Sequence, residues 1–270
     1  MEWSKYTGQE FSRRDFLKWL LAASGGMVLT NFLSACSNTE VSSPTSLLTT
    51  STISPILTPT TEPQQNLLAG LQGLDLDSFL DEAYRRWILR DPESVTINGL
   101  YDIFGVRNNL LNNGSDKFIR ETQRLQSGVL ELLRKYDPTA LTASQALNDR
   151  LYTWFLQDQE NGFPYTYSDY QVFPFLNSFS WIMNYLFTEA QPLNDLQDVQ
   201  DTIDRLGQVR IRCDQMAEGL RIRQENGVIL PVFLFQDAIE DLKQYTVPSS
   251  SHPFYNSFSS RIETIGSLTA

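Results

Sequence analysis

The stretch 76–88 reads LDSFLDEAYRRWI, and its apolar residues recur every three or four positions. This spacing places them on one face of an α-helix. Asp75 or Asp77 can cap the N-terminus of this helix, and Asp91-Pro92 predicts its end. The same periodicity continues along the chain, and no alternation typical of β-strands has a useful length. We therefore expect an all-α fold, an irregular multi-helix domain.

Capping and turn signals divide the rest of the chain into further helices. Ser115 predicts the start of one helix after an Asn-rich loop at 108–114, and Thr142 with Gln145 forms a capping box that opens another. Asp195 predicts the start of the longest helix. The remaining expected helices are 175–187, 231–245 and 253–265, with an irregular aromatic segment at 163–173. The expected apolar stripes are Leu147, Leu151, Trp154 and Phe155, then Leu196, Val199, Ile203, Leu206, Val209, Cys213, Met216 and Leu220.

The N-terminal segment carries an export signal. Residues 12–18 read SRRDFLK, and Arg13 with Arg14 resembles a twin-arginine signal. The apolar stretch 19–33 is too short and too rich in small residues for a spanning helix. Residues 33–36 read LSAC and resemble a lipobox, in which Cys36 is acylated and becomes the new N-terminus. We expect residues 1–36 to be a lipoprotein signal; the alternative is an ordinary amphipathic N-terminal helix.

Composition changes sharply after this signal. Residues 37–66 are rich in Ser, Thr and Pro and contain no aromatic residue. Such a segment buries too little apolar surface to offset its chain entropy, so we expect a disordered tether. Residues 67–270 are long enough for one helical domain. We thus expect an exported protein, lipid-anchored to the outer face of the cytoplasmic membrane, with the export machinery as a transient partner.

The formal net charge is −11. An acidic chain is a poor ligand for nucleic acid, so we expect no nucleic-acid partner and membrane contact through the lipid of Cys36 alone. Cys213 has no disulfide partner once Cys36 is lipidated, and we expect it to be a small buried residue on a helix.

Motifs for catalysis are absent from the sequence. His252 is the only histidine, whereas a catalytic zinc site needs three protein ligands. The chain contains no His-Glu-x-x-His, Gly-x-Ser-x-Gly, P-loop or dinucleotide fingerprint. We therefore predict no catalytic, cofactor-binding or metal-ligating residue in this chain.

Two groups of residues have alternative interpretations. The basic side chains on the 195–225 segment favour a solvated ion-pair face with i, i+4 pairs, although Arg221 or Arg223 could point into a cleft. The i, i+4 pairs are Asp201 with Arg205, Arg210 with Asp214, and Arg221 with Glu225. The aromatic segment 163–173 favours packing and loop anchoring, and the alternative is a groove wall.

Short motifs resemble the bacterial domain of unknown function 885 family over residues 74–265. They are FLDEAYRRW at 79–87, DPES at 91–94, GLY at 99–101, ETQ at 121–123, LT at 141–142, WFL at 154–156, QPL at 191–193, IDRL at 203–206, and DQ at 214–215 with EGLR at 218–221. The family tends to have His-Pro-Leu where this chain has Gln191.

The resemblance implies one half of a zincin-like helical fold. Full members of the family resemble zinc metallopeptidases, with a His-Glu-x-x-Pro-Gly-His motif in their C-terminal half. This chain has no such motif, so zinc is expected only with a missing C-terminal half. We expect a truncated or split N-terminal part of an exported metallopeptidase-like lipoprotein, inactive by itself, with a complementing C-terminal half as a possible partner.

Two other functions remain open. The chain could be a non-enzymatic surface lipoprotein that acts as a binding or scaffolding module. A solute-binding lipoprotein is disfavoured, because such proteins are usually α/β and no βαβ pattern is present.

Overall fold

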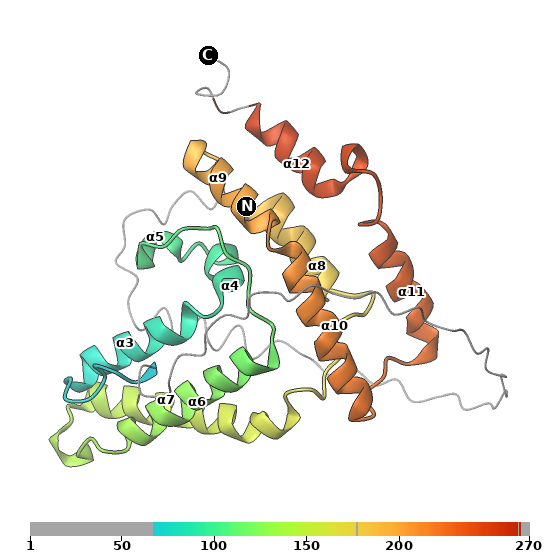
Figure 1. Cartoon of the computed structure of the whole chain (residues 1–270). Helices are drawn as coiled ribbons and strands as arrows, with labels where there is room; N and C mark the ends of the chain where they lie inside the picture. The colour runs from blue at the N-terminus through green and yellow to red at the C-terminus, as the bar shows by residue number, and fades with distance from the viewer. Residues whose placement is uncertain (1–66, 177, 264, 266–270) are drawn as a thin grey trace. The chain divides into compact units, whose positions relative to one another are not determined.

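The computed structural model describes residues 67–176, 178–263 and 265, all within one unit, Pro59–Ala270. Every regular element in these ranges is a helix, as Figure 1 shows, which confirms the all-α fold. The proposed signal, 1–36, and tether, 37–66, lie outside the described residues.

The helices have the following bounds in chain order. They are α3 (Leu76–Ile88), α4 (Pro92–Ile97), α5 (Tyr101–Phe104), α6 (Asp116–Leu133), η1 (Pro138–Ala140), α7 (Ala143–Gly162), η2 (Phe163–Tyr165), α8 (Phe179–Tyr185), η3 (Leu186–Ala190), α9 (Leu196–Leu206), α10 (Val209–Glu225), α11 (Val232–Lys243), η4 (Ser249–Ser251) and α12 (Pro253–Ile262).

Side-chain caps begin the helices where the sequence predicts them. The Asp75 carboxylate accepts a hydrogen bond from the backbone N–H of Ser78 at 3.1 Å, which opens α3. Ser115 caps α6, and Thr142 with Gln145 forms the expected capping box of α7. Each of these side chains satisfies a backbone N–H that has no partner within its helix.

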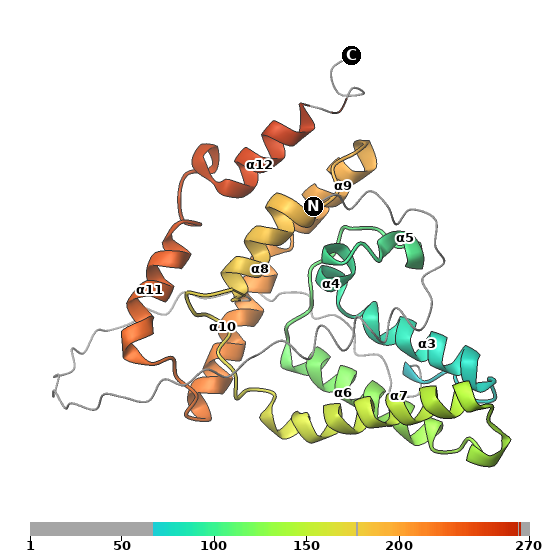
Figure 2. The same ribbon diagram turned by 180° about the vertical axis from the view of Figure 1, so that it is seen from behind.

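The first apolar core lies between α3, α6 and α7. Helices α6 and α7 lie side by side in both ribbon views, Figures 1 and 2, and α3 packs against α6. Phe79, Leu130 and Leu156 are buried there, and the Phe79 ring lies 5.4 Å from that of Tyr136. This core holds the three helices together through apolar burial.

The expected stripe of α7 is wrong for three of its four residues. Leu147, Leu151 and Trp154 are exposed, whereas Phe155 packs against the core as expected, next to the buried Leu156. The reason is that a helix with apolar residues on more than one side has no unique apolar face, so its neighbours decide which side is buried.

Two smaller apolar cores lie outside this three-helix layer. Met183, Leu186 and Phe187 form one with Leu111, and the Phe254 ring of α12 stacks on Phe187 at 4.7 Å. The other core consists of Ile88, Val95 and Leu100. The helix expected over 175–187 starts later, at Phe179, because Ser178 caps it, and it continues through the π-helical turn η3.

The segment after Asp195 is two helices rather than the single longest helix expected. Asp195 caps α9 as predicted, but α9 ends at Leu206 and α10 starts at Val209. The 20-residue α7 is longer than either. Helix α9 also buries its polar side, so Leu196 and Ile203 are exposed. The inner side of α9 binds the backbone of Asn108 and Leu110 through Asp201 and Arg205, which accounts for this reversal.

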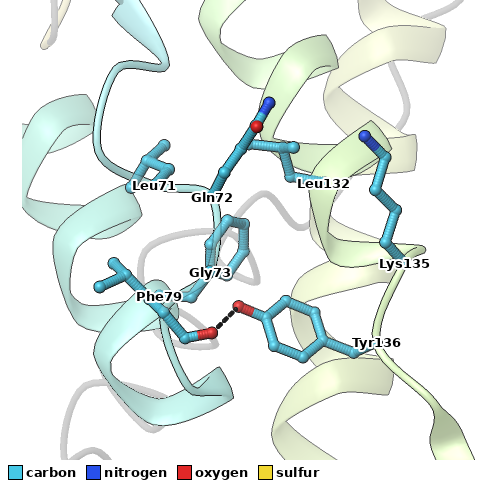
Figure 3. Close-up of a pocket in the computed structure, with 8 residues that line it drawn as sticks. Leu71, Gln72, Gly73, Phe79, Leu132, Lys135 and Tyr136 are labelled. Atoms are coloured by element: carbon cyan, nitrogen blue, oxygen red, sulfur yellow. Dashed lines mark hydrogen bonds between the residues drawn. The ribbon is translucent and has the colours of Figure 1, made fainter.

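A cavity of about 250 Å³ opens between α3 and the end of α6. Figure 3 shows Phe79 and Tyr136 at its wall, with Leu71, Leu132 and Lys135 around it. The Tyr136 hydroxyl donates a hydrogen bond to the carbonyl of Leu74 at 2.7 Å. Because its lining is mainly apolar and Lys135 is its one charged group, this cavity brings no reactive pair of side chains together.

Candidate functional site

Arg205 lies wholly buried on α9, with 0 % of its surface exposed. Its guanidinium joins three other segments of the chain. Nε donates to the carbonyl of Leu110 at 2.9 Å, and Nη2 donates to the hydroxyl of Thr96 on α4 at 2.7 Å. Nη1 donates to the side-chain oxygen of Gln191, which follows η3. The side chain expected on a solvated face is therefore at the centre of the domain.

The positively charged guanidinium of Arg205 donates its hydrogen bonds to uncharged acceptors. Burial lowers the pKa of its guanidinium to about 10, and the negative charges of Glu93 and Asp201 oppose this shift. The group therefore stays protonated at neutral pH. A buried cation is costly unless hydrogen bonds replace its hydration, and the three acceptors around Arg205 supply these bonds.

Asp201 does not pair with Arg205 as the i, i+4 spacing predicts. Its carboxylate instead accepts hydrogen bonds from the Arg107 guanidinium, from Gln197 at 2.9 Å and from the backbone N–H of Asn108 at 3.0 Å. Burial by itself would raise the pKa of Asp201, but these hydrogen bonds outweigh burial and lower the pKa. Asp201 is therefore an anion that holds the chain at 107–108.

Gln191 is also fully buried, with 0 % exposed. Its amide accepts from Arg205 and donates to the carbonyl of Asn108 at 3.3 Å. Gln191 therefore joins Arg205 to the start of the loop at 108–114.

Five polar residues of α9, α10 and the turn between them continue this arrangement along one side of the two helices. We define them as the polar stripe: Asp201, Arg205, Gln208, Arg212 and Gln215. Their positions differ by four, three, four and three, which is the spacing of one helix face. This spacing is the sequence signal that an analysis of apolar residues misses.

The polar stripe binds the Asn-rich loop in register, from its first residue to its last. The side chain of Gln208 accepts from the N–H of Leu111 at 3.1 Å and donates to the carbonyl of Asn109 at 2.7 Å. The side chain of Gln215 accepts from the N–H of Gly114 at 2.8 Å. Together with Asp201 and Arg205, these groups replace the backbone partners that a loop lacks.

Glu93 of α4 binds both the loop and the polar stripe. Its Oε1 accepts from the N–H of Asn112 at 2.9 Å and from Nε of Arg212 at 3.0 Å. A Cβ at Gly114 would lie 2.6 Å from Nη1 of Arg212, so a larger residue at this position would displace the end of the Arg212 side chain. The polar stripe and Glu93 position the loop, and these residues include no nucleophile next to a base.

A second arginine fixes the aromatic segment. Arg223 is buried, and its Nη2 donates to the carboxylate of Asp169 at 2.6 Å. Arg221 is exposed and pairs with Glu218 at 2.9 Å rather than with Glu225. A cavity of about 250 Å³ lies beside this contact, lined by Asp169, Tyr170, Gln171, Phe173, Phe179, Ile182 and Arg212. The groove-wall interpretation of the aromatic segment therefore has a physical counterpart.

His252, Cys213 and the pair Arg210–Asp214 have local roles. His252 caps α12, since its Nδ1 accepts from the N–H of Phe254 at 3.2 Å. Cys213 is exposed, so the expectation of a buried residue is wrong. The break between α9 and α10 and the burial of the polar stripe turn it outward. Arg210 and Asp214 form the expected exposed pair at 3.9 Å.

The predicted lipidation site, Cys36, and the predicted export residues, Arg13 and Arg14, lie outside the described residues. Within 67–176, 178–263 and 265, no three or more His, Cys, Asp or Glu side chains are grouped so that they could hold a metal ion. The same ranges contain no helix with the length and apolarity that crossing a membrane requires.

An apolar surface is exposed at the start of α11. We define it as the α11 apolar segment: Ile229, Val232, Phe233 and Phe235. Val232 is 90 % exposed and Phe233 is 77 % exposed. Phe175, Leu176 and Trp181 are exposed as well, and the Trp181 ring stacks on the half-buried Tyr185 at 5.3 Å. Phe235 is 53 % exposed.

A family model described as "Bacterial protein of unknown function (DUF885)" matches residues 92–269. The match begins at the first residue of α4, so it contains the loop and the whole polar stripe. No curated protein and no solved structure matches the chain.

The buried guanidinium gives a direct prediction for stability. Replacing Arg205 with Met leaves the acceptors at Leu110, Thr96 and Gln191 without their donor. We expect the free energy of unfolding to fall by about 3 kcal/mol or more. Arg210→Met, on the exposed side of α10, is the matched control and should change it by less than about 0.5 kcal/mol. Urea unfolding measures both, and equal losses would contradict the central position of Arg205.

Proposed function

The chain belongs to the family described as "Bacterial protein of unknown function (DUF885)", and we propose, from the sequence of its N-terminal segment, that it is an exported lipoprotein. Its helical region, 67–270, would form the N-terminal part of a metallopeptidase-like unit. In this proposal the region is not catalytically complete by itself, and a complementing helical segment packs against the α11 apolar segment.

The sequence of the N-terminal segment supports the membrane anchor. Arg13 and Arg14 precede a short apolar stretch that ends in the lipobox at Cys36. Each buried methylene of an acyl chain contributes about 0.8 kcal/mol to membrane binding, so more than one chain holds a protein stably. Residues 37–66 would then be a tether that carries the helical region away from the outer face of the cytoplasmic membrane.

The exposure of the α11 apolar segment supports a protein partner, and this observation carries the proposal. Large apolar side chains such as Phe233 are normally buried, because burial of a Phe side chain contributes roughly 1.5–3 kcal/mol. Four large apolar residues are exposed within seven positions of the chain here, and exposed apolar surface on a soluble protein commonly marks an interaction site when it is contiguous. We propose that the complementing segment is also helical and apolar on one side.

Zinc is the metal that the family resemblance implies. The residues present do not fit it, since the described ranges contain no grouping of three or more potential ligands. Zinc binding would therefore belong to the complementing segment rather than to the residues of this chain. The acidic net charge of −11 also disfavours a nucleic-acid partner.

A second function is favoured by the polar stripe. The polar side chains of Arg205, Asp201 and Gln191 all find hydrogen-bond partners within this chain. A domain that satisfies its own polar groups in this way can be stable as a non-enzymatic binding or scaffolding module. The two functions differ in whether the α11 apolar segment needs a partner.

The anchor is tested by cell fractionation. The Cys36→Ala variant should leave the membrane fraction or remain as an unprocessed precursor, because no acyl chain can be attached. Cys213→Ala is the matched control and should fractionate as the original chain does. Arg13→Lys combined with Arg14→Lys should block export. Unchanged fractionation and processing of Cys36→Ala would contradict the anchor.

The partner surface is tested by analytical ultracentrifugation of residues 67–270 with a dye that reports exposed apolar surface. We expect self-association and dye binding, both reduced by Phe233→Asp. Ile103→Asp, at another exposed apolar position on α5, is the control and should reduce neither. A monomeric, dye-negative protein with a cooperative thermal transition would instead favour the scaffolding module.

A further inference from the structure

A cleft of about 460 Å³ shares no lining residue with the cavity in Figure 3. It lies between the end of α3, the first half of α6, the end of α7 and η2. Its lining comprises Trp87, Arg90, Asp91, Asn112, Asn113 and Phe118, among others. A volume of this size is typical of sites for small molecules.

Amide side chains line the floor of the cleft. Gln126 of α6 is 6 % exposed, and its Nε2 donates to Oε1 of Gln159 on α7 at 3.4 Å. No described residue donates to Oε1 of Gln126, and this bond leaves the N–H groups of Gln159 for another acceptor. A nearly buried acceptor and a donor therefore lie side by side at the floor.

A carboxylate and aromatic rings complete the site. Asp158 is exposed at the cleft on α7, and no described residue forms an ion pair or hydrogen bond with it. Trp87 and Phe163 contribute half-buried rings to the walls. The Arg90 guanidinium lies over the Phe118 ring at 3.8 Å, which gives a further flat surface.

We propose that this cleft binds a neutral carbohydrate of one or two rings. One face of a sugar ring presents C–H groups, which pack on aromatic surfaces such as Trp87. Its hydroxyl groups donate to a carboxylate or an amide oxygen and accept from an amide N–H, and Asp158, Gln126 and Gln159 provide these groups. An N-acetylated sugar adds an amide that can pair with the two glutamines.

The charges of the cleft favour a neutral ligand. Asp91 and Asp158 repel anions, and Arg90 already binds the hydroxyl of Thr122 at 2.7 Å and the Phe118 carbonyl at 3.2 Å. The inference does not depend on the proposed metallopeptidase-like unit, because all the side chains involved lie on α3, α6, α7, η2 and the segments next to them.

The test is isothermal titration calorimetry of the full chain in detergent with the disaccharide of N-acetylglucosamine. We expect saturable binding with a Kd on the order of 1 mM or below. Gln159→Leu and Asp158→Asn should each weaken binding about fivefold or more, because each removes a hydrogen-bonding group. Gln157→Leu, an exposed position on the same helix outside the cleft, should bind as the original chain does.

Circular dichroism verifies that each variant keeps its helical content. Absence of saturable binding to the original chain would overturn the proposal. Equal affinity in Gln159→Leu and Gln157→Leu would place the binding elsewhere and also overturn it. A neutral tetrapeptide is titrated in parallel, and binding of the peptide without the disaccharide would show that the cleft recognises peptide instead.

Discussion

The loop at 108–114 is partly buried, at Asn108 and Leu111, and no strand or helix satisfies its backbone. The rest of the domain depends on how these backbone groups find hydrogen-bond partners. The polar stripe of α9 and α10 supplies the missing partners, with Arg205 fully buried at its centre. Glu93 supplies another from α4. A loop held in this way connects the α4–α5 region to α6 and fixes both against α9 and α10.

This solution explains why α9 presents apolar residues to solvent. The inner side of the helix has to carry hydrogen-bonding groups, so Leu196 and Ile203 remain on the outer side. The apolar cores lie elsewhere, between α3, α6 and α7 and around Leu186 of η3. Apolar burial therefore joins helices to helices, and the polar stripe joins helices to the loop.

Local signals made much of the fold predictable. Asp75, Ser115 and Thr142 cap helices because their side chains reach backbone groups three residues away, which needs no knowledge of the rest of the chain. The buried face of α9 and the exposed position of Cys213 depend on distant partners. Apolar periodicity could not show them, although the spacing of the polar stripe was present in the sequence. The cleft between α3, α6 and α7 likewise depends on tertiary packing, so its lining could not be predicted.

Hydrogen–deuterium exchange of the loop backbone tests this account most directly. The backbone N–H groups of Asn108, Leu111, Asn112 and Gly114 donate to side chains of the polar stripe and of Glu93. We predict that they exchange as slowly as the amides in the middle of α6, within about tenfold, because both are released by the same unfolding event. Exchange as fast as that of exposed amides, while α6 stays protected, would contradict the account.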